Sequence, residues 1–124
     1  MCIRDRSYYE PWGYTPLESI VFHVPTVTTD LAGFGLWVNS LKGRFSELAD
    51  GVKVIHRTDY NYSEVADVIK DTVSDFSALS AAEIKKIRKN AAAIAEKALW
   101  KHFIQYYYEA YDIALRNAEK RLAL

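Results

Sequence analysis

One stretch decides how this 124-residue chain folds: Glu10-Pro11-Trp12-Gly13-Tyr14-Thr15-Pro16-Leu17-Glu18. It places two carboxylates eight positions apart, separated by a tight turn that opens into a helix. Thr15 is the expected N-cap of this helix, Pro16 suits its first position, and Glu18 falls at the third. The unpaired N–H groups and the positive dipole end of a helix start suit a phosphate or diphosphate. Gly13 has no side chain, so the backbone there can approach such an anion closely.

The same helix start has a simpler interpretation. Thr15-x-x-Glu18 is also an ordinary capping box, and Glu10 can be a loop carboxylate with no task. The helix start alone favours this simpler interpretation, and only the complete string of residues argues against it. In both cases we expect a helix over about residues 16–24, buried along the side that carries Leu17, Ile20, Val21 and Val24.

Two strings resemble a known family. Residues 10–18 resemble the E-x7-E donor motif of retaining GT-B glycosyltransferases, and YYEPWGYTP (8–16) is similar in particular to glycogen synthases of the eukaryotic type. The run PTVTTDLAGFG (25–35) is similar to the same family, and a weaker similarity continues to about Leu115. The resemblance implies an enzyme that transfers glucose from a nucleotide-diphosphate glucose to an α-1,4-glucan with retention.

The resemblance also implies roles for individual residues. Glu10 is the candidate catalytic residue, near the transferred glucose, and Glu18 is expected on the ribose hydroxyls. Enzymes of this class need no covalent carboxylate nucleophile, so the two carboxylates are not predicted to be a glycosidase acid/nucleophile pair. No cofactor is implied. The expected substrate-binding residues are Glu10, Trp12, Gly13, Tyr14, Thr15 and Glu18.

The donor and the activity of this segment are left open by its residues. UDP-glucose is favoured because the motif resembles the UDP-using eukaryotic type, but no residue here reads the base, so ADP-glucose is an alternative. Another retaining GT-B transferase is a second alternative. A third is a nucleotide-binding module that is inactive as an isolated fragment, because the glucan-binding domain and the upstream basic residues of the family are not in this chain. Assembly into an oligomer is possible.

Composition indicates a soluble globular protein. Half of the residues are hydrophobic, 26% are charged, and 16 basic side chains balance 16 acidic ones. This balance provides no basis for general affinity to nucleic acid or to a membrane surface. Cys2 is the sole cysteine, which excludes an intramolecular disulfide and favours the cytoplasm. Residues 1–6 are expected to be a non-native leader, because they are too short and charged for a signal peptide and do not resemble the family.

The pattern along the chain predicts an α/β fold. A helix–strand–helix–strand–helix order implies parallel strands joined by right-handed crossovers. Two strands make a poor parallel sheet, so we expect the chain to begin within a Rossmann-like domain. The resemblance implies that this is a nucleotide-sugar-binding domain of GT-B type, with its end in residues 7–60 and its C-terminal helices in residues 61–124. The expected strands are residues 26–29 and 52–56. After the first helix, we expect a second helix over residues 35–49 and a third that begins near Asn61. A fourth helix should run from the capping box at Ser80 to about Lys97, and a fifth over about residues 99–118.

The loop Ala32-Gly33-Phe34-Gly35 has two interpretations. Gly-x-Gly alone is a weak phosphate-loop signal, and a packing turn is favoured. The loop nevertheless follows a parallel strand, at the sheet edge where ligands bind, so it has a possible part in shaping the donor site. The histidines His23, His56 and His102 show no metal-ligand spacing, so they are expected to pack or to face solvent, with no metal site.

Three features of the C-terminal half have a structural and a functional interpretation. Tyr106-Tyr107-Tyr108 and Tyr111 could stack on carbohydrate, but their helical spacing predicts Tyr107 and Tyr111 in the core. The aromatic stripe of the last helix is expected either on the local sheet or against the other domain of a GT-B protein. The cluster Lys85-Lys86-Arg88-Lys89 predicts a solvated helix face. In the family that the chain resembles, an arginine-rich helix at this place binds a sugar phosphate that activates the enzyme. Only Arg88 matches that helix here, and Ile84 and Asn90 stand where arginines are expected. Allosteric control by a sugar phosphate is therefore not predicted.

Overall fold

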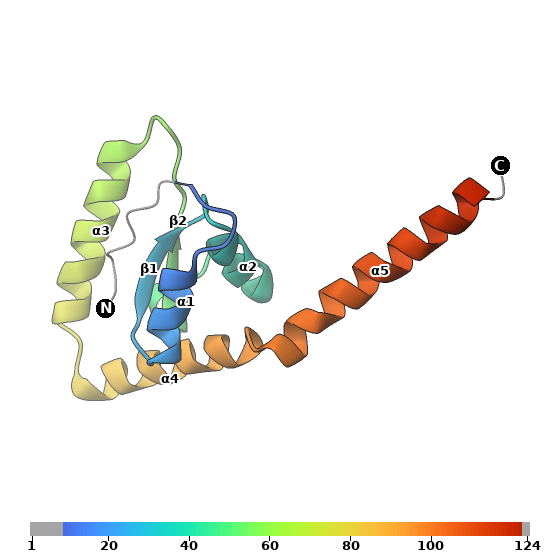
Figure 1. The fold of residues 1–124 in the computed structure, drawn as a ribbon. Helices are drawn as coiled ribbons and strands as arrows, with labels where there is room; N and C mark the ends of the chain where they lie inside the picture. Colours follow the sequence, from blue (N-terminus) through green and yellow to red (C-terminus); the bar gives the residue numbers. More distant parts are fainter. Residues whose placement is uncertain (1–8, 123–124) are drawn as a thin grey trace.

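Two short strands form a parallel sheet in the computed structural model, which describes residues 9–122 (Figure 1). β1 (Thr26–Thr29) and β2 (Val52–Ile55) pair with Thr26 opposite Val52. Both strands are rich in β-branched side chains, which fit a pleated, buried surface. The two predicted strands and their parallel pairing are confirmed. The predicted leader and Cys2 lie outside the described residues.

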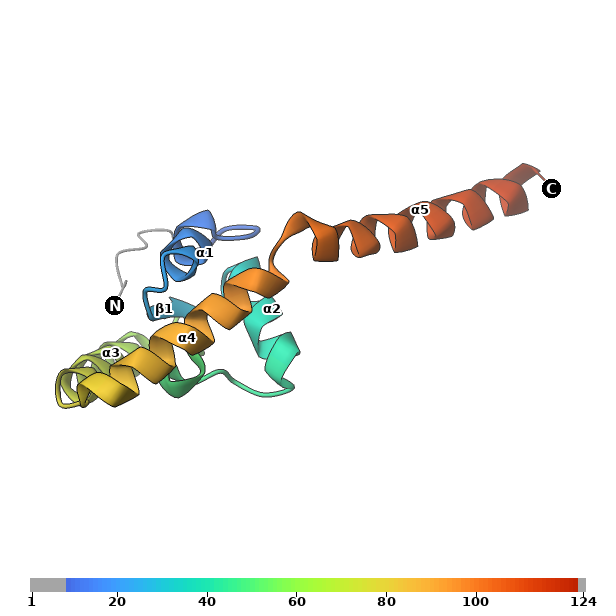
Figure 2. The same cartoon turned by 90° about the horizontal axis from the view of Figure 1, so that it is seen from below.

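Helices cover both faces of this sheet. α1, α2 and α4 pack on one face and α3 packs on the other, and Figure 2 shows α4 running alongside α1. A parallel sheet needs this cover, because both of its faces are apolar. The predicted mixed α/β class is therefore confirmed for the described part of the chain. The helices are α1 (Tyr14–Val21), α2 (Gly33–Lys42), the 3-10 helix η1 (Leu48–Asp50), α3 (Tyr62–Ser77), α4 (Ala81–Lys97) and α5 (Trp100–Leu122).

The alternation of side chains along β2 divides the core in two. Val52 and Val54 point to the face covered by α1, α2 and α4, whereas Ile55 points to α3. Each fully buried large side chain stabilises the fold by about 1.5–3 kcal/mol, so the first core is the stronger of the two. That core consists of Ile20, Phe34, Val38, Val52, Val54, Ala91 and Ile94, and the second consists of Val27, Ile55 and Val65.

The prediction of a single helix over residues 35–49 is wrong. α2 ends at Lys42, because Gly43 takes a left-handed backbone conformation, with φ 64°. The chain then turns inward, and Ser46 is fully buried. The Ser46 N–H donates to Asn39 Oδ1 at 2.9 Å, and the Ser46 hydroxyl donates to the Val52 carbonyl oxygen at 2.7 Å. These bonds satisfy the polar groups of a buried turn and lead the chain through η1 into β2.

α3 and α4 follow their predicted signals. Asn61 is the N-cap residue of α3, and Val65 is the buried apolar residue of its predicted stripe. Ser80 caps α4 through the predicted capping box with Glu83, and α4 ends at Lys97 as expected. The capping box satisfies N–H groups that the first turn of a helix leaves unpaired.

α5 leaves the rest of the fold after its first turn and projects away from it (Figures 1 and 2). None of the described residues of α5 is buried. Tyr107 and Tyr111 are 48% and 58% exposed, so the prediction that they lie in the core is wrong. The spacing predicted an apolar stripe correctly, but no other described element buries that part of the helix. No helix among residues 9–122 combines the length and the apolar character that crossing a bilayer requires.

Candidate functional site

The start of α1 is an open helix N-terminus. The helix begins at Tyr14, with Gly13 as its N-cap residue and no side chain capping it. The prediction that Thr15 is the N-cap is therefore wrong, and no capping box joins Thr15 to Glu18. The reason lies in Gly13, whose φ of 103° is a left-handed conformation that glycine adopts at little cost. The helix starts immediately after this residue, one turn before Glu18, and its first N–H groups stay available to an anion.

Glu10 folds back over this helix start. Its backbone forms an isolated parallel bridge with Ala32. Its side-chain Oε1 lies so close to Gly13 that a Cβ built on Gly13 would stand 3.0 Å from it. The structure thus brings the candidate catalytic carboxylate and the turn before α1 together. Any side chain at position 13 would both strain the backbone and crowd this carboxylate.

The other predicted substrate-binding side chains divide into two groups. Tyr14, Thr15 and Glu18 are exposed, on the open side of α1. Trp12 is half-buried, and its ring contacts Phe34, Trp37 and Phe103 at centroid distances of 6.0, 5.7 and 5.3 Å. Trp12 therefore anchors the turn in an aromatic cluster that reaches the first turn of α5. Together with Tyr14 it also lines an aromatic groove whose other residues are Leu17, Ala98, Trp100, Phe103, Tyr106 and Tyr107.

The loop between β1 and α2 supports this turn from behind. The Phe34 N–H donates to the Trp12 carbonyl oxygen at 2.6 Å. A Cβ on Gly33 would lie 2.1 Å from the Pro11 carbonyl oxygen, and one on Gly35 would lie 2.1 Å from the Thr29 carbonyl oxygen. No side chain fits at either place, so both glycines serve close backbone packing. This is the packing-turn interpretation of the loop, and it makes the loop a support for residues 10–12.

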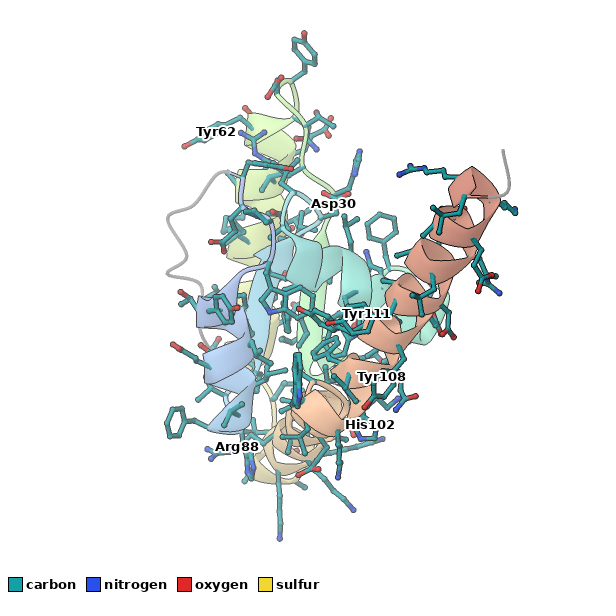
Figure 3. All side chains as sticks on the ribbon, turned by 45° about the vertical axis from the view of Figure 1, so that its right-hand side comes forward. Asp30, Tyr62, Arg88, His102, Tyr108 and Tyr111 are labelled. Atoms are coloured by element: carbon teal, nitrogen blue, oxygen red, sulfur yellow. The ribbon has the colours of Figure 1, made fainter. Side chains whose placement is uncertain are left out.

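A pair that sequence analysis missed lies at the carboxyl ends of the two strands. Asp30 follows β1 and His56 follows β2, and Asp30 Oδ2 lies 2.5 Å from His56 Nδ1. The Arg57 N–H donates to Asp30 Oδ1 at 2.9 Å. Figure 3 shows Asp30 near the start of α3, which Tyr62 marks, and far from Arg88. The positions of the two residues could have predicted this contact, because residues that follow neighbouring parallel strands meet at one edge of the sheet.

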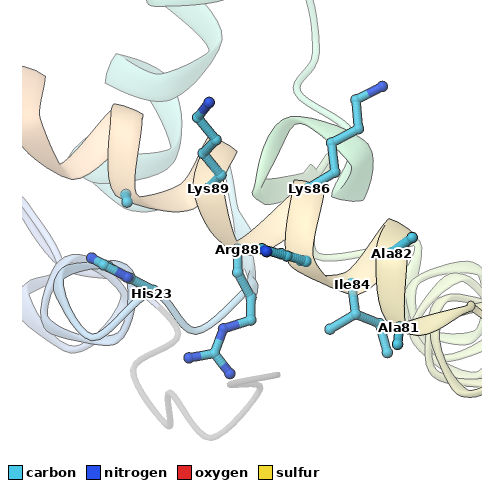
Figure 4. Close-up of a pocket in the computed structure, with 9 residues that line it drawn as sticks. His23, Ala81, Ala82, Ile84, Lys86, Arg88 and Lys89 are labelled. Atoms are coloured by element: carbon cyan, nitrogen blue, oxygen red, sulfur yellow. The ribbon is translucent and has the colours of Figure 1, made fainter.

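The basic cluster of α4 lies at the other end of the fold. Arg88 and His23 line an open groove together with the first two turns of α4 (Figure 4). Lys86 and Lys89 line the same groove but point away from Arg88 in that view. The four basic side chains of the cluster are exposed, which agrees with the predicted solvated face. His23 is exposed and has a positive φ of 59°, and His102 is exposed on α5.

Comparison with known proteins places the chain in a family. The family model described as Glycogen synthase matches residues 5–121. The chain is 31% identical over 112 residues to the glycogen [starch] synthase of Neurospora crassa and 30% identical over 112 residues to isoform 1 of Saccharomyces cerevisiae. It is also 30% identical over 112 residues to the liver glycogen [starch] synthase of Mus musculus. Each alignment covers 90% of this chain but only 16% of the relative.

The described part of the chain is of the mixed α/β class, with helices on both faces of a two-stranded parallel sheet. Within that class, the match over residues 5–121 is decisive. The chain belongs to the glycogen synthase family.

Proposed function

We propose that this chain is the C-terminal donor-binding part of a glycogen synthase with GT-B architecture. The enzyme transfers glucose, with retention, from a nucleotide-diphosphate glucose to an α-1,4-glucan in the cytoplasm, and UDP-glucose is the favoured donor. The proposal divides the chain into a leader (1–6), the end of the Rossmann-like domain (7–60) and the C-terminal helices of that domain (61–124). The observation that carries the proposal is the uncapped start of α1 with Glu10 folded over Gly13.

This arrangement suits the charges that develop during glucosyl transfer. As the bond between C1 and the diphosphate breaks, positive charge grows on the sugar ring and negative charge grows on the leaving diphosphate. Preorganised groups that stabilise both charges lower the barrier. The N–H groups that open α1 at Tyr14 and Thr15, aided by the helix dipole, receive the diphosphate. Glu10, beside the same turn, faces the positive charge of the sugar.

The two carboxylates have separable roles in this proposal. Glu10→Ala removes a group that acts in the transition state, so kcat falls by about 10²–10³-fold. Glu18→Ala removes an exposed contact to the ribose, so the donor KM rises by about tenfold with a smaller change in kcat. Glu64→Ala, at an exposed position on α3, is the matched control and keeps wild-type kinetics. Steady-state kinetics of the full-length protein measure all three. Wild-type kcat in Glu10→Ala would refute the assignment of the site.

The alternative is that the chain alone is an inactive nucleotide-binding module. This alternative is favoured because the chain covers only 16% of the length of its relative from Neurospora crassa. The glucan site of such an enzyme then has to come from the rest of the protein. Calorimetric titration of the isolated chain with UDP and with ADP, followed by an assay of glucan extension, tests it. Binding without turnover is the expected result. Glucan extension by the isolated chain would contradict it, and a preference for ADP would overturn the choice of donor.

A further inference from the structure

Asp30, which follows β1, bonds to the end of β2 and the residues after it through its N–H and both carboxylate oxygens. Its N–H donates to the Ile55 carbonyl oxygen at 3.1 Å. One carboxylate oxygen accepts the Arg57 N–H, and the other lies 2.5 Å from His56 Nδ1. A carboxylate only accepts hydrogen bonds, so Nδ1 of His56 carries the hydrogen of this contact. The Asp30 side chain is 12% exposed, whereas that of His56 is 64% exposed.

The backbone after Asp30 leads directly to the candidate catalytic carboxylate. Two residues further on, Ala32 forms the bridge with Glu10. Gly33 packs against the Pro11 carbonyl oxygen, and the next N–H, of Phe34, donates to Trp12. Three consecutive residues of this loop thus hold three consecutive residues of the turn before α1. The position of the loop therefore decides where the backbone of Glu10 lies.

We propose that Asp30 and His56 form a positioning clamp for Glu10. The clamp fixes the first residue of the supporting loop to the end of β2, and the loop transmits that position to the Glu10 backbone. This inference rests on the proposed function, because it assigns the clamp to the same site. His56 touches no substrate in this proposal, so it is a positioning residue.

The location of the pair argues for positioning rather than for stability alone. β1 and β2 already pair along four residues, from Thr26 opposite Val52 to Thr29 opposite Ile55. Ion pairs with one exposed partner add little to stability, commonly about 0–1 kcal/mol. The clamp stands instead at the carboxyl edge of the sheet, where parallel sheets bind their ligands. A displacement of about 1 Å in a catalytic group can lower turnover by about 10²-fold, so a weak but well-placed contact has a large effect there.

The test compares three variants of the full-length enzyme. His56→Ala removes the donor to Asp30, and we expect kcat to fall about tenfold with the donor KM changed by less than about twofold. His56→Asn places an amide N–H near the position of Nδ1, and we expect it to recover most of the lost kcat. His102→Ala, at an exposed histidine on α5, is the matched control and keeps wild-type kinetics. The midpoint of thermal unfolding is measured for each.

Two outcomes overturn the clamp. One is wild-type kcat in His56→Ala, whether or not its unfolding midpoint falls. The other is a folded His56→Asn that loses as much turnover as His56→Ala. If His56→Ala does not fold, Asp30→Asn replaces it, because the amide oxygen still accepts the Arg57 N–H while the charge facing His56 is lost. Failure of the proposed function is distinct, since it shows as wild-type turnover in Glu10→Ala.

Discussion

The N–H of Phe34 donates to the carbonyl oxygen of Trp12 across 2.6 Å, and this bond joins the start of α2 to the turn that opens α1. The two residues are also in edge-to-face ring contact, with centroids 6.0 Å apart. Backbone and side chains therefore hold the same two segments together. The loop after β1 contributes to the candidate site by this route, as a support for the turn.

Replacing Gly33 should disrupt that support. The Cβ of Gly33→Ala would stand 2.1 Å from the Pro11 carbonyl oxygen, so the loop and the turn have to move apart. We expect a lower unfolding midpoint and loss of nucleotide binding. Gly43→Ala is the matched control: it meets nothing within 4 Å and costs only the strain of its φ of 64°, about 1 kcal/mol. Equal unfolding midpoints and nucleotide affinities for the two variants would contradict this account of the loop.

Asp50 should make stability depend on pH in the acid range. Partial burial raises the pKa of its carboxyl, but hydrogen bonds from the Glu47 N–H, Lys42 and Arg44 outweigh that effect, so the pKa lies below its ordinary value of 3.8. Because the folded pKa is depressed, the contribution of Asp50 is complete above pH 3.8 and is lost as pH falls through the lower, folded value.

The variant Asp50→Asn tests this direction of the pH dependence of stability. The variant should be less stable than the wild type near neutral pH, and the difference should shrink as the pH falls below 3.8. Unfolding midpoints measured at a series of pH values report it. A difference that stays constant down to pH values well below that point would show that the ion pairs of Lys42 and Arg44 with Asp50 contribute nothing to the effect.

Ser80→Ala should weaken the start of α4. The Ser80 N–H donates to Glu83 Oε2 at 2.8 Å, and the Ser80 hydroxyl accepts the Glu83 N–H at 3.4 Å. Loss of such a cap typically costs about 1 kcal/mol of folding free energy. Ser74→Ala, at an exposed position within α3, is the control and should change stability by less than about 0.5 kcal/mol. Chemical denaturation of both variants measures the difference.

Local signals explain which elements could be predicted from the sequence. Both strands and the start of α4 depend on neighbours in the chain, such as the capping box of Ser80. The end of α2 does not: apolar residues continue at helical spacing through Phe45 and Leu48, and the burial of Ser46 against Val52 overrides that pattern. The N-cap at Gly13 depends on a left-handed φ that Thr15-x-x-Glu18 does not reveal.

The residues of the candidate site also divide into those that local sequence could predict and those that depend on tertiary contacts. The motif located Glu10 and the helix start, because both lie within one continuous string. The contact between Asp30 and His56 joins residues 26 positions apart and exists only once β1 and β2 have paired. Tyr107 and Tyr111 illustrate a third case: their spacing indicates that the stripe is apolar, but it carries no information about what covers it.

The aromatic stripe of α5 should be covered in the full-length enzyme. Trp100, Tyr107 and Tyr111 form a ladder of ring contacts, with centroids 5.2 and 6.4 Å apart, on a helix with no buried residue in the described part of the chain. Isolated helices are marginal in water and gain most of their stability by packing an apolar face. We therefore expect the stripe to lie against the other domain of a GT-B enzyme, which is the second of its two predicted partners.

Hydrogen exchange tests this expectation with an internal control. In the isolated chain the amides of residues 104–118 should exchange fast, and in the full-length enzyme they should be protected, because packing raises the free energy of local opening. The amides around Ala91 and Ile94 of α4 lie in the core and should be protected in both proteins, which confirms that the isolated chain is folded. Fast exchange of residues 104–118 in both proteins, with α4 protected, would show that no other domain covers the stripe.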